Sequence, residues 1–169
     1  MPTIQLRTEI KASRELVFDV SRSVDLHQIS TRHSHETAIA GITSGLIGLH
    51  GSVTWRAKHF GIFQRLTSTI TDYDRPKFFA DEMVSGAFKS FRHEHHFEKL
   101  NGGTLMLYTF AYRSPLGVLG RMADALFLKR YMAGLLEKRN AVIKEYAESG
   151  KWKEVLRDAA ESMSDPSDH

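Results

Sequence analysis

The stretch SFRHEHHFEKLNGGTLMLYTFAY, residues 90–112, decides the fold class of this chain. Two runs in which apolar and polar residues alternate, 90–100 and 104–112, flank an Asn-Gly-Gly turn at 101–103. A period of two is typical of half-buried strands, and Asn-Gly between two such runs is a strong hairpin signal. The stretch therefore predicts two long antiparallel strands.

The sequence before this hairpin has further strand and helix signals. Residues 3–10 alternate in the same way, and Ser13 is a suitable N-cap for a short helix that begins at Arg14. A second short helix is expected at Val24–Ser30. Between residues 35 and 112, turn residues separate six expected strands: Glu36–Ala40, His50–His59, Phe63–Tyr73, Phe78–Met83, Ser90–Leu100 and Thr104–Tyr112.

The hydrophobic period changes at Ser114-Pro115, since serine as N-cap and proline at the first helical position favour the start of a helix. Apolar residues then recur every four residues from Leu119 to Leu135, which predicts one long amphipathic helix over about 115–148. We expect Gly134 to let this helix bend or approach the sheet closely. One strand, two short helices, six strands and a long helix form an α+β order.

Composition and charge exclude several classes of protein. The chain has 169 residues, 41% hydrophobic, and no cysteine, so disulfide frameworks and thiol nucleophiles are excluded. A net charge of +3 is too small to suggest nucleic-acid binding. The longest stretch without charge, Thr37–Trp55, is rich in glycine and polar residues, which argues against a membrane span. We expect a soluble cytoplasmic protein without a cofactor.

A set of ordered motifs carries a family resemblance over about residues 3–147. They are DYDRPKFFADE at 72–82, SGAF at 85–88, FxHxHxF at 91–97, GT at 103–104 and YxxPxGxxG at 112–120. Together they resemble the START/Bet v 1-like (SRPBCC) superfamily, and most closely its bacterial ligand-binding and polyketide cyclase-like members. One departure is Tyr108, because close relatives often carry an acidic residue on that strand.

The resemblance implies a helix-grip fold, in which a curved seven-stranded antiparallel sheet wraps around a long C-terminal helix and encloses a hydrophobic pocket. Members bind lipids, sterols, polyketides or plant hormones, and a few catalyse cyclisation or dehydration. We expect residues 1–148 to form a single helix-grip ligand-binding domain. Residues 149–169 form a polar extension, for which we expect a short helix followed by a disordered tail.

The FxHxHxF motif holds the strongest candidate for chemistry. Phe91, His93, His95 and Phe97 share one face of their strand. If they face the pocket, the two imidazoles would bind a carbonyl or hydroxyl group of a ligand. In an enzyme, one imidazole would act as a general base while Tyr108 holds an enolate oxygen. Alternatively, both histidines are structural. No metal site is expected, because a third ligand beside His-x-His is not evident and His50, His59 and Glu82 are merely available.

Other apolar residues occupy alternating or helical positions that could face a pocket. Each of them could equally fill a solid core. The full set of expected ligand-binding residues is Trp55, Leu66, Ile70, Phe79, Phe91, His93, His95, Phe97, Met106, Tyr108, Phe110, Met122 and Leu126.

The resulting functional hypothesis is binding of a small hydrophobic ligand (a lipid, a polyketide or an aromatic compound) between the sheet and the long helix. The alternative is a cyclase/dehydratase-like enzyme that uses pocket histidine and tyrosine side chains as acid and base. A third hypothesis is a partner-binding module. The predicted long helix has a basic face that comprises Arg121, Lys129, Arg130, Lys138 and Arg139. This face could make transient contact with a membrane, although exposure to solvent is the simpler interpretation. The oligomeric state is left open.

Overall fold

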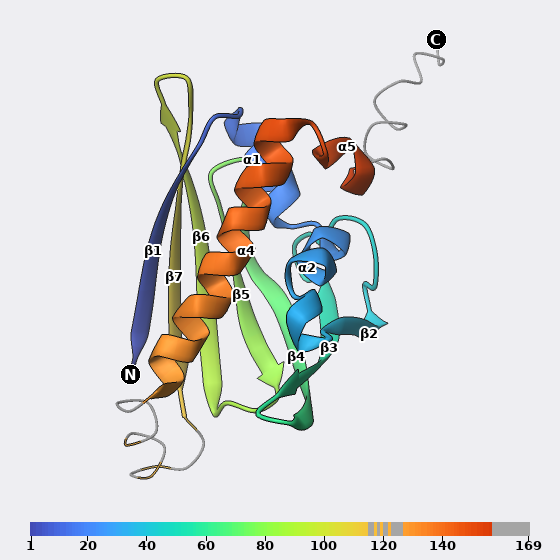
Figure 1. Ribbon diagram of the computed structural model, residues 1–169, viewed down its shortest axis with the longest axis vertical. Coiled ribbons are helices and arrows are strands. Elements are labelled where there is room, and N and C mark those ends of the chain that lie inside the picture. Colours follow the sequence, from blue (N-terminus) through green and yellow to red (C-terminus); the bar gives the residue numbers. More distant parts are fainter. Residues whose placement is uncertain (115–116, 118, 120–121, 123–126, 157–169) are drawn as a thin grey trace.

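A computed structural model describes residues 1–114, 117, 119, 122 and 127–156 of the chain. Its strands form one seven-stranded sheet in the order β1-β7-β6-β5-β4-β3-β2, and each neighbouring pair is antiparallel. The strands are β1 Thr3–Ile10, β2 Thr37–Gly41, β3 Ser52–His59, β4 Ile62–Asp74, β5 Phe78–Ser85, β6 Ser90–Leu100 and β7 Gly103–Arg113. The α+β helix-grip prediction is confirmed, since the sheet curves around the long helix α4 (Figure 1).

The two short helices after β1 form where the sequence predicts them. Helix α1, Arg14–Ser21, begins with the Ser13 hydroxyl accepting a hydrogen bond from the backbone N–H of Leu16. Helix α2, Val24–Ser30, is capped in the same way by Ser23. Such caps satisfy backbone donors that a helix leaves unpaired at its first turn. A 3₁₀ helix, η1 at Arg32–Ser34, follows α2 and was not expected.

The long helix α4 spans Lys129–Ser149 and ends at Gly150, whose φ of 78° is left-handed and suits glycine. The first part of the predicted helix, from 115, falls mostly on residues outside those described. Outside the backbone of α4, no described atom lies within 4 Å of a Cβ built on Gly134, so the expected close approach of the sheet at this glycine is absent among the described residues. A short helix, α5 at Trp152–Val155, follows α4.

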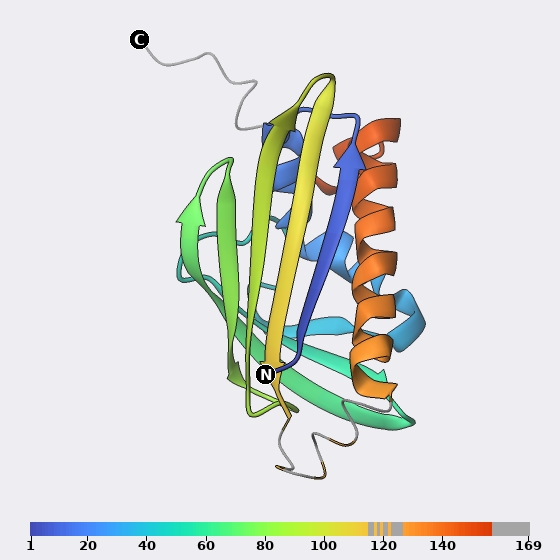
Figure 2. The same ribbon diagram turned by 90° about the vertical axis from the view of Figure 1, so that its left-hand side faces the viewer.

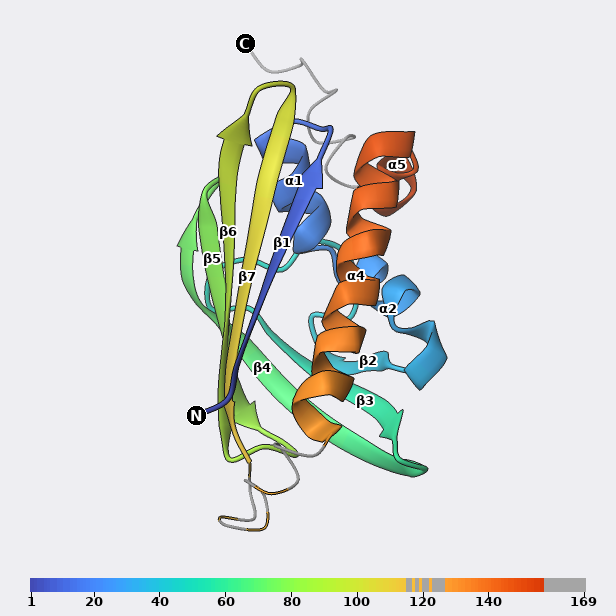
Figure 3. The ribbon, with the colours of Figure 1, turned by 60° about the vertical axis from the view of Figure 1, so that its left-hand side comes forward.

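The concave face of the sheet is filled unequally along its length. Figures 2 and 3 show α4 running along this face, with α1 and α2 beside its C-terminal half. At that end Phe18 of α1 meets Tyr73, Phe79 and Phe97 edge-to-face, with ring centroids 5.3–5.4 Å apart. Helix α1 therefore covers this end of the sheet with packed aromatic rings, and the candidate site lies beneath the first half of α4.

Candidate functional site

A cavity of about 440 Å³ lies between the sheet and α4. Its wall is mostly apolar, built by residues of β3, β4, β6 and β7 on one side and by the first half of α4 on the other. Leu66, Phe91 and Phe110 come from the sheet, and Met132 and Leu136 come from the helix. A volume in the range of about 300–1,000 Å³ is that of a typical small-molecule site.

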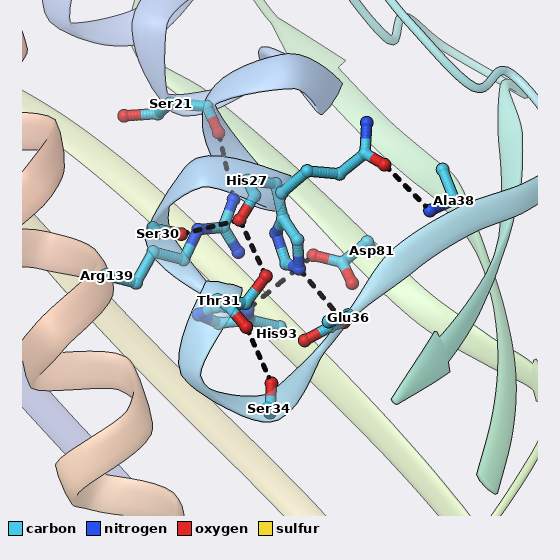
Figure 4. Close-up of polar contacts among 11 residues, drawn as sticks. Ser21, His27, Ser30, Thr31, Ser34, Glu36, Ala38, Asp81, His93 and Arg139 are labelled. Atoms are coloured by element: carbon cyan, nitrogen blue, oxygen red, sulfur yellow. Dashed lines mark hydrogen bonds and ion pairs between the residues drawn. The ribbon is translucent and has the colours of Figure 1, made fainter. Parts of the chain in front are cut away.

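One end of the cavity is polar (Figure 4). His27 of α2, Glu36, Asp81 of β5, His93 of β6 and Arg139 of α4 all line it. These residues lie far apart in the sequence and meet because the curved sheet, α2 and α4 converge at this point. A second cavity, of about 60 Å³, is lined by some of the same residues, including His27, Asp81 and Arg139. The arrangement is a hydrophobic chamber with a cluster of titratable groups at its inner end.

His27 is held by two neighbours. Its Nε2 lies 3.1 Å from Oε1 of Glu36, and its ring stacks on Trp55 with centroids 4.1 Å apart. Burial, together with the charge of Arg139, lowers the pKa of His27 in spite of Glu36. Burial by itself would raise the pKa of Glu36, but the contact with His27 outweighs it and the pKa is lowered. The contact with Glu36 fixes the orientation of the His27 ring, and burial favours its neutral form.

Asp81 and the two histidines of the FxHxHxF motif meet across two neighbouring strands. Asp81 is paired directly opposite His93, and its Oδ1 lies 3.7 Å from His93 Nδ1 and 3.1 Å from His95 Nε2. Burial raises the pKa of Asp81 and lowers the pKa of both histidines well below 6.5. Both rings are therefore neutral at neutral pH. Asp81, His93 and His95 are the described residues that could hold a metal ion.

Arg139 points into the site, which corrects its assignment to a solvated basic face. Its Nη2 donates a hydrogen bond to the backbone carbonyl of Ser21, 3.0 Å away, at the end of α1. Lys129, Arg130 and Lys138 are exposed, as expected. Arg139 differs because it lies on the side of α4 that faces α1 and the sheet.

The structure separates the expected ligand-binding residues into groups. Trp55, Leu66, Phe91, His93 and Phe110 line the large cavity, and Ile70 and Phe79 line the small one. His95, Phe97, Met106 and Tyr108 are packed in solid core beneath α1 and line neither cavity. Met122 is 58% exposed, and Leu126 lies outside the described residues.

Sequence reasoning missed four polar residues of the site. Asp81 could have been found, because it is two residues from Phe79 on the same strand and therefore shares its face. His27, Glu36 and Arg139 come from α2, the segment before β2, and α4, and a single sequence offers no signal that these elements meet. Their convergence depends on the curvature of the sheet.

Comparison with known proteins agrees with the fold. The family model described as "Polyketide cyclase / dehydrase and lipid transport" matches residues 1–148. No match is found among curated protein sequences. No helix among the described residues is long and apolar enough to cross a membrane.

Solved structures with the same architecture come from bacteria and plants. A START superfamily protein of Mycobacterium smegmatis is 12% identical in sequence and superposes with a TM-score of 0.65. The match covers 86% of this chain and 96% of the Mycobacterium chain. Protein TTHA0849 of Thermus thermophilus is 16% identical, with a TM-score of 0.66, covering 84% and 97%. Ginseng major latex-like protein 151, from Panax ginseng, is 14% identical, with a TM-score of 0.63, covering 86% and 97%. At these identities the likeness concerns the fold.

Proposed function

Because the chain belongs to the polyketide cyclase / dehydrase and lipid transport family, within the START/Bet v 1-like superfamily, we propose that it binds a small hydrophobic molecule between the sheet and α4. The observation that carries the proposal is the cavity of about 440 Å³ beneath the first half of α4. Burying ~300 Å² of apolar ligand surface at ~25 cal/mol per Å² contributes about 7 kcal/mol before ordering costs. That is close to the free energy of micromolar binding.

The proposed ligand has an apolar body and one polar end. Leu66, Phe91 and Phe110 offer apolar contact along the cavity, whereas His27, His93 and Arg139 offer polar groups at its inner end. A carbonyl or hydroxyl group is well suited to this end, because neutral imidazoles donate or accept hydrogen bonds and the guanidinium donates. Lipids, polyketides and aromatic compounds with an oxygen function meet this description.

A cavity-filling variant tests the proposal. Ala57 is buried on β3 and lines the cavity, so Ala57→Trp should occupy the space that a ligand needs. We expect the chain to bind the fluorescent probe 1-anilinonaphthalene-8-sulfonate, and Ala57→Trp to weaken that binding at least tenfold. Lys58→Trp is the matched control, since Lys58 is the next residue of the strand and faces solvent.

Two outcomes decide the cavity proposal. Equal probe affinity in the native chain and in folded Ala57→Trp would place the probe on the surface and contradict the proposal. Native mass spectrometry of protein purified from cells provides a second measurement, because a hydrophobic ligand bound tightly between the sheet and α4 is carried through purification. If the protein is always empty, including after incubation with panels of lipids and polyketides, the proposal is wrong.

A second candidate function is a cyclase/dehydratase-like reaction with His93 as general base. The observation in its favour is a neutral imidazole on the cavity wall whose Nδ1 lies 3.7 Å from a partly buried carboxylate, Asp81. Tyr108 is packed in the core, away from the cavity lining, so the enolate-holding role has no support from its position. Unchanged turnover of a linear poly-β-ketone by a folded His93→Gln variant would reject this candidate.

A further inference from the structure

Three potential metal ligands converge inside the fold. Asp81 of β5, His93 and His95 of β6 each offer one ligand atom, and these atoms lie within 4.8 Å of one another. The cross-strand pairing of Asp81 with His93 and the period of two along β6 bring them to the same face. Both histidine side chains are at least nine-tenths buried, at 5% and 1% exposure.

The distances suit a small divalent cation. His95 Nε2 and His93 Nδ1 lie 3.1 and 3.7 Å from the same carboxylate oxygen of Asp81. In a tetrahedral site with metal–ligand distances of about 2.1 Å, neighbouring ligand atoms are about 3.4 Å apart. The two measured separations lie on either side of this value. The third separation, between the two histidine nitrogens, is at most 4.8 Å, so the side chains would adjust to share one ion.

The hydrogen bonds among Asp81, His93 and His95 leave some of their buried polar atoms without a partner. Nε2 of His93 and Nδ1 of His95 are buried without a hydrogen-bond partner among the described residues. The close side-chain contacts of Asp81 are with the two imidazoles, and no described lysine or arginine lies within ion-pair distance of it. The ring nitrogens that face Asp81 are the other two, Nδ1 of His93 and Nε2 of His95, so a shared cation would offset the charge of the partly buried carboxylate and leave the two unpartnered nitrogens unchanged.

The surrounding charges permit a divalent ion. Among the described residues, Glu36 and Arg139 share the polar end of the cavity with Asp81. The formal charges of Asp81, Glu36 and Arg139 sum to −1. The Arg139 guanidinium donates to the Ser21 carbonyl. Binding of a divalent cation would change this net charge from −1 to +1, so the net charge at the site stays small.

We propose that Asp81, His93 and His95 form a binding site for a divalent transition-metal ion, for which Zn²⁺ is the best match. Two imidazoles and one carboxylate are ligands that zinc accepts, whereas Mg²⁺ and Ca²⁺ prefer oxygen ligands alone. Three protein ligands leave a fourth position open. Since Asp81 and His93 line the large cavity, that position faces the chamber.

The test is direct binding of Zn²⁺ to the full chain without an affinity tag and without organic ligand, measured by competition with a chromophoric chelator. We expect one equivalent to bind, with affinity reduced more than tenfold by Asp81→Asn and by His95→Gln. His96→Gln is the matched control, since His96 lies on the same strand but on the opposite, more exposed face. It should bind like the native chain.

Equal affinity in Asp81→Asn and the native chain, or no stoichiometric binding by the native chain, would overturn the proposal. If the variants fail to fold, the imidazole ¹⁵N resonances of the native chain, recorded by NMR with and without Zn²⁺, test the site instead. Zn²⁺ should shift those of His93 and His95 and leave that of His96 unchanged, and any other pattern contradicts the site. Because no organic ligand is present, failure here is separate from failure of the proposed cavity function.

Discussion

Arg139 of α4 and the backbone carbonyl of Ser21 are joined by a hydrogen bond of 3.0 Å that ties the long helix to the end of α1. The donor is a charged guanidinium in a partly buried position, and hydrogen bonds to charged groups contribute about 1.5–3 kcal/mol each. The same side chain lines both cavities. It therefore links the packing of the two helices to the polar end of the site.

The first prediction is that Arg139→Gln lowers the free energy of unfolding by about 1.5–3 kcal/mol. The variant loses the charged donor to Ser21, and the shorter side chain packs less well between α1 and α4. Urea denaturation followed by circular dichroism measures the change. Lys138→Gln is the control, because Lys138 is the neighbouring residue and is exposed. An equal effect of both substitutions would show that the Ser21 contact contributes nothing.

The second prediction concerns Phe18, which fills the closed end of the fold. Phe18→Ala should cost about 3–5 kcal/mol, because it removes a fully buried ring that meets Tyr73, Phe79 and Phe97 edge-to-face. Phe63→Ala provides a matched control on a ring that is 50% exposed and lies under the Arg56 guanidinium. Its cost should stay below about 1 kcal/mol. Comparable losses in both variants would contradict this account of the core.

The architecture was accessible to sequence reasoning because its signals are local. The alternation on either side of Asn101-Gly102-Gly103 predicts β6 and β7, and the register pairs Leu100 with Gly103 as that turn requires. Ser13 and Ser23 cap α1 and α2 through hydrogen bonds within one helical turn. Each of these features depends on residues that are close in the sequence.

The site was less accessible, because it depends on where the helices cross the sheet. His93 and His95 share one face of β6, yet His93 lines the large cavity while His95 is fully buried against Phe79 and lines neither cavity. The difference arises from α1, where Ser21 contacts Met106 and Phe18 contacts Phe97. A period of two indicates which side chains point inward. It does not indicate which stretch of the inner face a helix will cover.

The third prediction concerns pH, through Asp19 of α1. Burial by itself would raise the pKa of Asp19, but hydrogen bonds and charges from Arg75 and Arg22 outweigh it and lower the pKa below 3.8. A lowered pKa in the folded state means that the stabilisation is present above about pH 4 and is lost as pH falls through the folded value. Asp19→Asn should therefore be less stable at pH 7, by on the order of 1 kcal/mol, and should approach the native chain in acid.

Urea titrations at several pH values between about 7 and 2.5 would measure this convergence. The control is Asp74→Asn, because Asp74 pairs with Lys77 at 3.4 Å while its side chain is 60% exposed. Exposed pairs contribute little, so this variant should follow the native chain within about 0.5 kcal/mol. A constant difference between Asp19→Asn and the native chain at every pH would be inconsistent with a lowered pKa.

The fourth prediction uses two glycines for which the same substitution should act in opposite directions. A Cβ on Gly103 would lie 2.3 Å from the Ile10 carbonyl oxygen, so Gly103→Ala requires a backbone shift between β1 and β7 and should cost on the order of 1–3 kcal/mol. A Cβ on Gly134 of α4 meets no described atom within 4 Å outside the backbone of its own helix, and alanine is the better helix former by about 0.5–1 kcal/mol. Gly134→Ala should therefore raise the denaturation midpoint, while Gly103→Ala lowers it. If Gly134→Ala were destabilising instead, α4 would have to lie closer to its neighbours than the open space at this glycine indicates.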